Sequence, residues 1–438
     1  MNANAIPGED PEPPRSVCIV GGGPAGMMAG VLLARQGVDV TVLEKHPDFY
    51  RDFRGDTLHP WTLEIFQDLG WLDELLDIPH RRMSEVSMTM GDTSLTFADF
   101  SRLPVTSPFI AFMPQWDFLE LLASKGRRNP HFTLVQGAEV VDVVRDSGRV
   151  FGVTCRRADS SEPFTVTADF VIAADGRNSV LRTAAGLTPR ASSPPIDVLW
   201  FRLPRAPDET VAFFRGGDGA LVSIDRGDYW QVAFALPAGS IDALRDAGIG
   251  AFRKRVARLQ PEFTPQVEEI RSWDDVHLLS VRVDRLPQWT RPGLLFIGDS
   301  AHAMSPAGGV GINLAIQDGV AAANMIGPAL RAGTDVDEAA RRVQRRRSLP
   351  ARITQLFQLV VLRDLYPRSQ GAAVRPPVLL HVFRIVPVLR RLMGRFIGLG
   401  VRPEHPDPVR PENPTDRNAR TDRNAQSEPN AGNQYVDD

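Results

Sequence analysis

The chain has 438 residues, with 50 basic and 53 acidic side chains and a formal net charge of −3. This length suits two domains, and the balanced charge gives no reason to expect nucleic acid as a partner. Cys18 and Cys155 lie in apolar strand-like stretches, which favours buried thiols in a reducing compartment over a disulfide framework. We expect a cytoplasmic protein, because no secretory signal and no apolar run of about 18 residues is evident. No metal site is predicted.

The first predicted unit is a strand, a glycine turn and a helix. An apolar run over 17–20 precedes glycines with G-x-G-x-x-G spacing, and a smooth apolar stretch reaches Ala34. This context is typical of a dinucleotide site, in which the glycines allow a tight turn, close approach to a pyrophosphate and close packing of helix on strand. Free N–H groups at the helix start would hold the diphosphate. The expected contacts are Gly21, Gly23, Pro24, Ala25 and Gly26.

A second strand over 38–44 ends in Glu44, with Lys45 beside it. Glu44 lies 23 residues after Gly21, close to the spacing of roughly 20 expected for an acid that binds a ribose hydroxyl. The two strands and the acid favour a dinucleotide site that includes Glu44 and Lys45 over a plain glycine-rich turn.

The next elements follow from apolar periodicity. Helices are predicted over 61–76, 115–123, 238–259 and 314–332. Antiparallel strands are predicted over 83–112 and 195–236, and further strands over 132–169 and 276–283. Two more buried strands end in polar turns, one before Asp175 and one before Asp299.

The C-terminal part is predicted to be helical to about residue 397. The arginines within 341–347 are typical of a solvated helix face, with an anionic contact site as the alternative. The apolar, arginine-containing stretch over 378–399 is expected to dock on the protein body, and a weak peripheral contact with a membrane is the alternative. From residue 401 onward the chain has almost no apolar residues and is expected to be disordered.

Three turns of cofactor-binding type therefore stand in order along the chain. They are the glycine turn with Glu44, the pair Asp175-Gly176 and the pair Gly298-Asp299. This combination resembles the flavin-dependent aromatic hydroxylases, the single-component monooxygenases typified by p-hydroxybenzoate hydroxylase. The resemblance implies an α/β fold, with a Rossmann-like FAD-binding domain, an interleaved antiparallel-sheet substrate domain and a C-terminal helical segment.

The resemblance also suggests domain boundaries. The FAD-binding domain is expected over 15–82, 113–185 and 285–335, and the substrate domain over 83–112 and 186–284. The remaining segments are a flexible N-terminus over 1–14, C-terminal helices over 336–400 and a disordered tail over 401–438.

Several contacts to FAD are implied by the family pattern. Arg54 matches an arginine at the pyrophosphate, with Arg51 as a competitor for that role. Gln115 matches a glutamine at the ribityl and phosphate region, although it also suits an ordinary helix start. Val140 falls in the strand that offers its backbone to the adenine.

The second and third turns carry the other implied contacts. Asp175 matches an aspartate linked in the family to both FAD and NAD(P)H, and Asp299 matches the aspartate that holds the ribityl chain. A plain helix cap is the alternative for Asp299. The loop at the pyrimidine edge of the flavin is matched by Pro306, Gly308, Gly309, Gly311, Ile312 and Asn313.

The resemblance implies that NAD(P)H reduces FAD, that O₂ forms a flavin C4a-hydroperoxide, and that one oxygen atom passes to an aromatic, quinone-like or polyketide-like molecule. A flavin-dependent dehydrogenase or reductase, or a non-catalytic FAD-fold protein that binds a ligand, is the alternative. Either a monomer or a homodimer fits the sequence.

Substrate contacts are expected on the inner face of the second sheet, from Trp200, Arg202, Phe214 and Tyr229, together with Pro306. Each of these also suits a structural role. His59 is the candidate catalytic base, or else only a polar residue at a helix start. The phenol-deprotonating tyrosine relay of p-hydroxybenzoate hydroxylase has no positional match among the four tyrosines, which leaves the phenolic nature of the substrate open.

Overall fold

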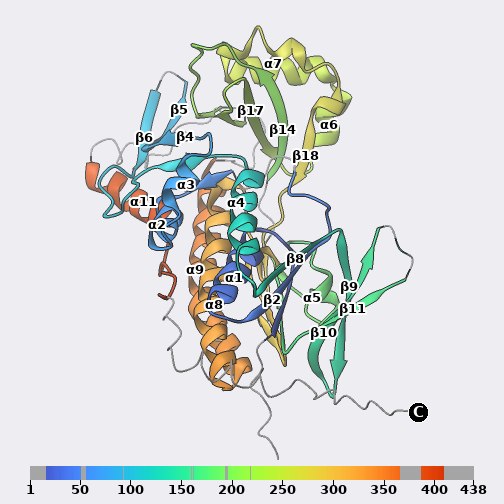
Figure 1. Ribbon diagram of the computed structural model, residues 1–438. Helices are drawn as coiled ribbons and strands as arrows, with labels where there is room; N and C mark the ends of the chain where they lie inside the picture. Colours follow the sequence, from blue (N-terminus) through green and yellow to red (C-terminus); the bar gives the residue numbers. More distant parts are fainter. Residues whose placement is uncertain are drawn as a thin grey trace, which may run out of the picture. The chain divides into compact units, whose positions relative to one another are not determined.

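A six-stranded, mostly parallel sheet lies at the centre of the larger half of the molecule (Figure 1). The computed structural model describes residues 16–50, 56–91, 93–158, 160, 162–192, 196–217, 219–365 and 386–408. The strand order is β20-β21-β12-β1-β2-β8, and only β20 runs antiparallel to its neighbour. Their bounds are β1 (Ser16–Val20), β2 (Asp39–Glu44), β8 (Phe132–Gln136), β12 (Phe170–Ala173), β20 (Thr290–Arg291) and β21 (Leu294–Phe296).

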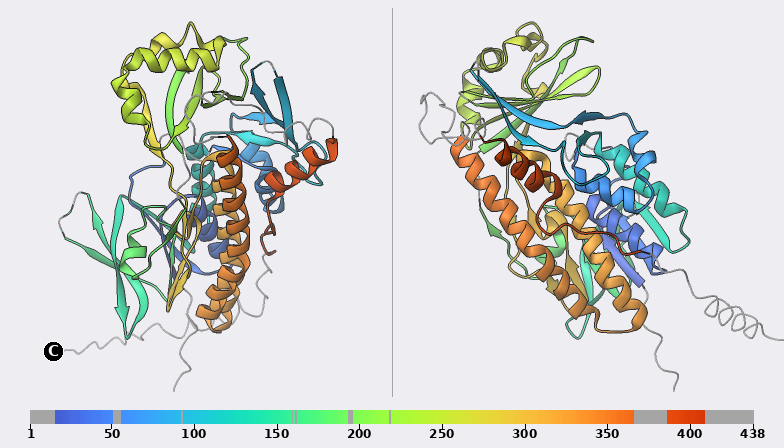
Figure 2. Two further views of the ribbon diagram at one scale, coloured as in Figure 1. Left: turned by 180° about the vertical axis from the view of Figure 1, so that it is seen from behind. Right: turned by 90° about the vertical axis from the view of Figure 1, so that its left-hand side faces the viewer.

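The central strands β1, β12 and β21 are almost continuously apolar because both faces of the sheet are covered. Figures 1 and 2 show helices on one side and a three-stranded sheet on the other. A Cβ on Gly319 would lie 2.6 Å from the Ala25 carbonyl oxygen, so this glycine lets α8 approach α1 closely. The covering elements are α1 (Pro24–Arg35), α4 (Gln115–Arg127), α8 (Val310–Ala332), α9 (Val336–Leu365), β9 (Ala138–Asp146), β10 (Arg149–Arg157) and β11 (Phe164–Thr167).

The second half is a seven-stranded sheet with the order β18-β14-β17-β16-β15-β5-β6, in which only β15 and β5 pair in parallel. Phe201, Phe234 and Phe252 are buried between one face of this sheet and α7. The bounds are β5 (Glu85–Met90), β6 (Thr93–Asp99), β14 (Ile196–Pro204), β15 (Phe214–Gly216), β16 (Ala220–Asp225), β17 (Tyr229–Pro237), β18 (His277–Ser280), α6 (Ile241–Asp246) and α7 (Ile249–Leu259).

Shorter elements join the two halves. The helix predicted over 61–76 is two helices, because Gly70 adopts φ +70° and ends the first one. The joining elements are α2 (Pro60–Asp68), α3 (Leu72–Leu76), α5 (Val180–Ala184), α11 (Pro387–Leu399), β3 (Thr57–Leu58), β4 (Arg81–Met83), β7 (Ile110–Phe112), β13 (Arg190–Ala191), β19 (Asp284–Arg285) and β22 (His302–Ala303). Single 3-10 turns are η1 (Pro261–Phe263), η2 (Val267–Glu269), η3 (Trp273–Asp275), η4 (Gly298–Ser300) and η5 (Ala307–Gly309).

The start of the predicted tail differs from the structure. The compact unit continues to Pro406, and residues 401–406 lie against the body instead of being disordered. Polar side chains hold this segment, and Glu404 is 7% exposed. The prediction from low apolar content therefore put the start of the tail at residue 401, before the end of the compact unit. The N-terminus over 1–14 and the tail from 409 onward lie outside the described residues, and their disorder stays a prediction.

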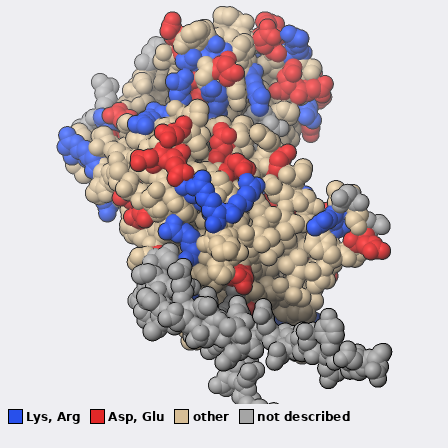
Figure 3. All heavy atoms as spheres, in the orientation of Figure 1, with Lys and Arg blue, Asp and Glu red and all other residues tan. Residues whose placement is uncertain are grey.

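Basic and acidic side chains are interspersed on the face shown in Figure 3. In the part of the chain that the structure describes, every helix is too short or too polar to cross a membrane.

Candidate functional site

The glycine turn between β1 and α1 has the predicted geometry. Gly21 adopts φ +107°, and a Cβ there would lie 2.3 Å from the Ala174 carbonyl oxygen. A Cβ on Gly26 would lie 2.0 Å from the Gly21 carbonyl oxygen, so both positions require glycine. Gly23 differs, because a Cβ there meets nothing within 4 Å. The backbone at Gly23 thus borders open space at the start of α1, which Pro24 opens without a side-chain cap among the described residues.

Glu44, at the end of β2, supports this turn directly. Its Oε2 accepts a hydrogen bond of 2.8 Å from the Gly22 N–H, and its Oε1 accepts one of 3.0 Å from the His46 N–H. The carboxylate is 3% exposed, so its predicted contact with a ribose stays a prediction. Lys45 is exposed, and Val140 is buried in β9.

The second turn places an arginine that the sequence analysis missed. Asp175 Oδ2 accepts a hydrogen bond of 3.2 Å from the Leu181 N–H at the start of α5. Burial raises the pKa of Asp175, and its hydrogen bonds oppose that effect. Arg177, two residues later, reaches the third turn and pairs with Asp299 Oδ2 at 3.1 Å. The second and third predicted motifs therefore meet.

Arg182 of α5 holds the third turn through its backbone carbonyl groups. Its guanidinium is 6% exposed and donates to the carbonyl oxygens of Ser300 at 2.5 Å and Asp299 at 2.7 Å. The same group forms a bidentate ion pair with Asp284 of β19, with N–O distances of 3.0 and 3.2 Å. The sequence signal was weak, since only the position of Arg182 seven residues after Asp175 connects it with the motif.

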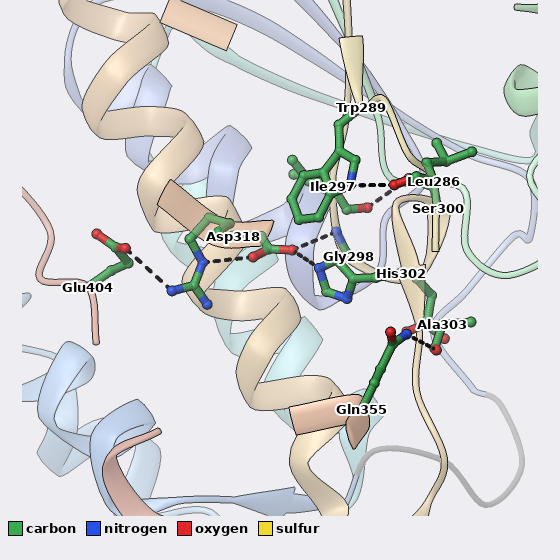
Figure 4. A network of polar contacts seen from close by, with 12 residues as sticks. Leu286, Trp289, Ile297, Gly298, Ser300, His302, Ala303, Asp318, Gln355 and Glu404 are labelled. Carbon is green, nitrogen blue, oxygen red and sulfur yellow. Dashed lines mark hydrogen bonds and ion pairs between the residues drawn. The ribbon is translucent and has the colours of Figure 1, made fainter. Parts of the chain in front are cut away.

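Asp318 of α8 fixes the same turn from the opposite side (Figure 4). Its Oδ2 accepts a hydrogen bond of 3.0 Å from the Gly298 N–H and lies 2.6 Å from His302 Nε2. Its Oδ1 accepts a hydrogen bond of 2.9 Å from Arg347 Nε. Burial raises the pKa of Asp318, but His302 and Arg347 outweigh burial and hold that pKa below its usual value.

The predicted flavin-edge loop follows this turn. Gly308 and Gly309 adopt φ +77° and +61°, and a Cβ on Gly309 would lie 2.1 Å from Thr57 Oγ1. The Asn313 amide donates to the carbonyl oxygens of Thr57 at 2.9 Å and Gly309 at 3.0 Å. Asn313 thus holds the loop to β3. The other predicted members in this loop and the start of α8 are Pro306, Gly311 and Ile312.

His59 lies beside this loop and is 1% exposed. Its Nδ1 is 2.9 Å from the Ile397 carbonyl oxygen, so this nitrogen carries a proton and donates it. Its backbone N–H donates to Asn313 Oδ1 at 2.8 Å. Burial lowers the pKa of His59 to about 4, against the opposing effect of the Ile397 and Gly308 carbonyls. The ring is therefore neutral at pH 7, and its role as a base stays a prediction.

Gln115 begins α4, as predicted, and its N–H donates to Asp56 Oδ1 at 3.3 Å. Asp56 in turn pairs with Arg226, between β16 and β17, so this contact links the two halves. Burial raises the pKa of Asp56, and Arg226 opposes that effect. Arg54 and its competitor Arg51 lie outside the described residues.

The predicted substrate residues divide into two pairs. Trp200 and Phe214 belong to one apolar cluster with Ala307, on the sheet face opposite α7. The Arg202 guanidinium instead lies 4.9 Å from the centroid of the Tyr229 ring. The structure therefore brings only the first pair together with the loop before α8.

The site fits a dinucleotide that carries a flavin. Gly23 leaves open the space where a pyrophosphate would approach the start of α1. Asp175 Oδ1 and Arg177 Nη1 are buried and have no hydrogen-bond partner among the described residues. These two atoms offer an acceptor and a charged donor for the hydroxyl and phosphate groups of such a cofactor.

Comparisons with known proteins agree with this geometry. The model of a family described as "FAD binding domain" matches residues 15–356. A 6-methylpretetramide 4-monooxygenase from Streptomyces rimosus is 33% identical over 400 residues, which cover 88% of this chain and 94% of the relative.

Two solved structures share the fold. PqsL from Pseudomonas aeruginosa, described as a probable FAD-dependent monooxygenase, has a TM-score of 0.69 at 21% identity. The match covers 82% of this chain and 98% of PqsL. The anhydrotetracycline hydroxylase OxyS from Streptomyces rimosus has a TM-score of 0.67 at 22% identity. The match covers 91% of this chain and 78% of OxyS.

The fold and the three turns are those of a nucleotide-binding protein with a second, seven-stranded sheet. The chain belongs to the FAD-binding family of flavin-dependent aromatic hydroxylases. It is an FAD-dependent monooxygenase with NAD(P)H as co-substrate, which confirms the class of enzyme and the cofactor predicted from the sequence.

Proposed function

We propose that this monooxygenase inserts one oxygen atom into a fused-ring aromatic molecule of polyketide type. The observation that carries the proposal is the 33% identity over 400 residues to a protein named for a 6-methylpretetramide substrate. Because the match covers 94% of that relative, it includes the substrate sheet as well as the cofactor domain.

The lining of the substrate sheet supports a flat apolar substrate. Trp200 and Phe214 face the loop before α8, and Phe213 lies against Phe112 with ring centroids 5.7 Å apart. Aromatic side chains give large apolar contact areas and stack against flat rings. Such a surface favours a polycyclic substrate over a small polar one.

The same proposal gives each turn a role toward FAD. The N–H groups at the start of α1 would bind the pyrophosphate, and Asp299 would accept hydrogen bonds from ribityl hydroxyls. The positive end of α8 would face the pyrimidine edge of the flavin, where it stabilises negative charge. FAD supplies the hydride and oxygen chemistry, and the protein supplies binding, orientation and exclusion of water.

The test is a screen of fused-ring phenols and quinones for stimulated NAD(P)H oxidation by the holoenzyme. We expect O₂ consumption coupled to a product that has gained one oxygen atom by mass spectrometry. Stimulated NAD(P)H oxidation with a reduced product and no oxygen gain would instead support a dehydrogenase or reductase. A flavin that no nicotinamide donor reduces would support the non-catalytic alternative.

A variant pair tests the substrate face. Trp200→Phe is expected to raise KM for the accepted substrate about tenfold, since it shortens an aromatic surface on the substrate side. Trp273→Phe is the matched control, because Trp273 packs on the opposite face with α7. Equal effects of the two variants would contradict the assignment of the substrate face.

A further inference from the structure

Residues 400–406, which we term the C-terminal strap, leave α11 and lie across α2, α8 and α9. The indole N–H of Trp61 on α2 donates to the Glu404 carbonyl oxygen at 2.8 Å. The amide of Asn324 on α8 donates to the His405 carbonyl oxygen at 2.7 Å. The rings of Trp61 and His405 meet edge-on with centroids 4.6 Å apart. Specific polar contacts therefore hold this segment of low apolar content.

The strap supplies acceptors to a guanidinium that has no contact with water. Arg347 of α9 is 0% exposed. Its Nη1 donates to the Arg402 carbonyl oxygen at 3.2 Å and lies 3.3 Å from Glu404 Oε1. The same carboxylate oxygen lies 2.7 Å from Arg346 Nε. Glu404 thus neutralises positive charge inside the protein.

Arg347 connects the strap with the turn that carries Asp299. Its Nε donates to Asp318, and Asp318 accepts the Gly298 N–H on its other oxygen. Figure 4 shows this line of contacts from Glu404 to Gly298. Only two fully buried side chains, Arg347 and Asp318, separate the strap from the residue before Asp299.

Buried charges keep one position only while their partners stay in place. Without Glu404 and the Arg402 carbonyl, Arg347 would retain Asp318 as its charged partner, and water would reach the pair. The Asp318 carboxylate would keep His302 beside its Oδ2, but its Oδ1 would lose a partner that is fixed in place. The acceptor of the Gly298 N–H would then be held from one side only.

We propose that the strap is a positioning element for the cofactor. It fixes Arg347, which fixes Asp318, which holds the backbone of the turn that presents Asp299 to the ribityl chain. No residue of the strap contacts FAD in this arrangement. The inference depends on the ribityl role of Asp299 proposed above, and it predicts that loss of the strap weakens FAD binding about tenfold.

Two truncations of the full chain test the proposal. One ends after residue 408 and keeps the strap, and the other ends after residue 399 and removes it. FAD is titrated into each apoprotein, with quenching of flavin fluorescence as the signal, well below the melting temperature of either. We expect the longer protein to bind FAD as the full chain does and the shorter one about tenfold more weakly. Equal dissociation constants would overturn the proposal.

Point variants separate a positioning role from a merely structural one. Glu404→Gln removes the charge beside Arg347, and Glu338→Gln, which breaks exposed ion pairs on the same helix α9, is the control. In the Asp299→Ala background, Glu404→Gln should weaken FAD binding much less than in the natural chain, because both act through one turn. Additive effects would contradict the proposal.

The two proposals fail in distinguishable ways. If Asp299→Ala alone binds FAD normally, the ribityl role of Asp299 is wrong. If Asp299→Ala weakens binding and Glu404→Gln adds its full effect, only the strap proposal is wrong. Neither result bears on the substrate, which oxygen insertion tests separately.

Discussion

The buried imidazole of His59 predicts a pH dependence of stability that can be measured against a variant without it. In the folded protein burial lowers its pKa to about 4, whereas the ordinary pKa of a histidine side chain is 6.5. Between these values the unfolded chain binds a proton that the folded chain does not bind. The stabilising contribution is therefore complete above pH 6.5 and is lost as the pH falls toward 4.

The size of this effect follows from the pKa difference. Each unit is worth about 1.4 kcal/mol, so the shift of His59 corresponds to roughly 3 kcal/mol, of which about 2 to 3 kcal/mol are lost between pH 7.5 and 4.5. His59→Asn keeps a donor near the position of Nδ1 but does not titrate. At pH 7.5 we expect the variant to be about 1 kcal/mol less stable, because the contact with the Ile397 carbonyl is weakened.

The assay is urea unfolding of the natural chain and of His59→Asn at pH 7.5, 6.0 and 4.5. The stability difference should shrink with falling pH and reverse by pH 4.5. His131→Asn is the control, since His131 is a partly exposed imidazole paired with Asp39. Parallel pH profiles of the natural chain and His59→Asn would refute the reasoning. The turnover rate of His59→Asn also tests whether His59 acts as a catalytic base. A fall of about 100-fold or more in kcat, with FAD still bound, would support that role.

Two further substitutions test the turns of the site. Gly26→Ala should yield protein without bound FAD, because the added Cβ would lie 2.0 Å from a carbonyl oxygen of the glycine turn. Flavin absorbance after purification measures the bound FAD. Gly250→Ala is the control, because a Cβ at that position meets nothing within 4 Å. Arg182→Met should lower the free energy of unfolding by about 3 to 5 kcal/mol, because it leaves Asp284 buried without its charged partner. Arg177→Met should cost much less, since that side chain is 21% exposed, and similar losses in urea titrations would contradict this difference.

The sequence was informative where chemistry and local structure coincide. Glu44 ends β2, Asp175 and Asp299 follow β12 and β21, and these three strands are near neighbours in one parallel arrangement around β1. Parallel strands bring their carboxyl ends to one edge of the sheet, so three separate local patterns predicted one site. The glycine turn was predictable as well, because Gly21 and Gly26 leave no room for a Cβ.

The supports of this site were not predictable, because their partners are distant in sequence. The arginines within 341–347 were interpreted as a solvated helix face, yet Arg347 is fully buried and pairs with Asp318. A run of arginines in the sequence does not indicate which of their side chains is buried. The strap was predicted to be disordered for a related reason. A low content of apolar residues argues against hydrophobic burial, but it does not indicate whether ion pairs such as the one at Glu404 hold a segment in place.

The turn at 298–300 is held by residues from five regions of the chain. On one side Arg182 ties the turn to Asp284, where the chain returns from the seven-stranded sheet. On the other side Asp318 ties it to α9 and, through Arg347, to the strap. A short turn with a single hydrogen-bonded side would be free to tilt, and its carboxylate would lose a fixed direction. Charge pairs on both sides remove that freedom, so the position of Asp299 depends on segments that are distant from it in the sequence.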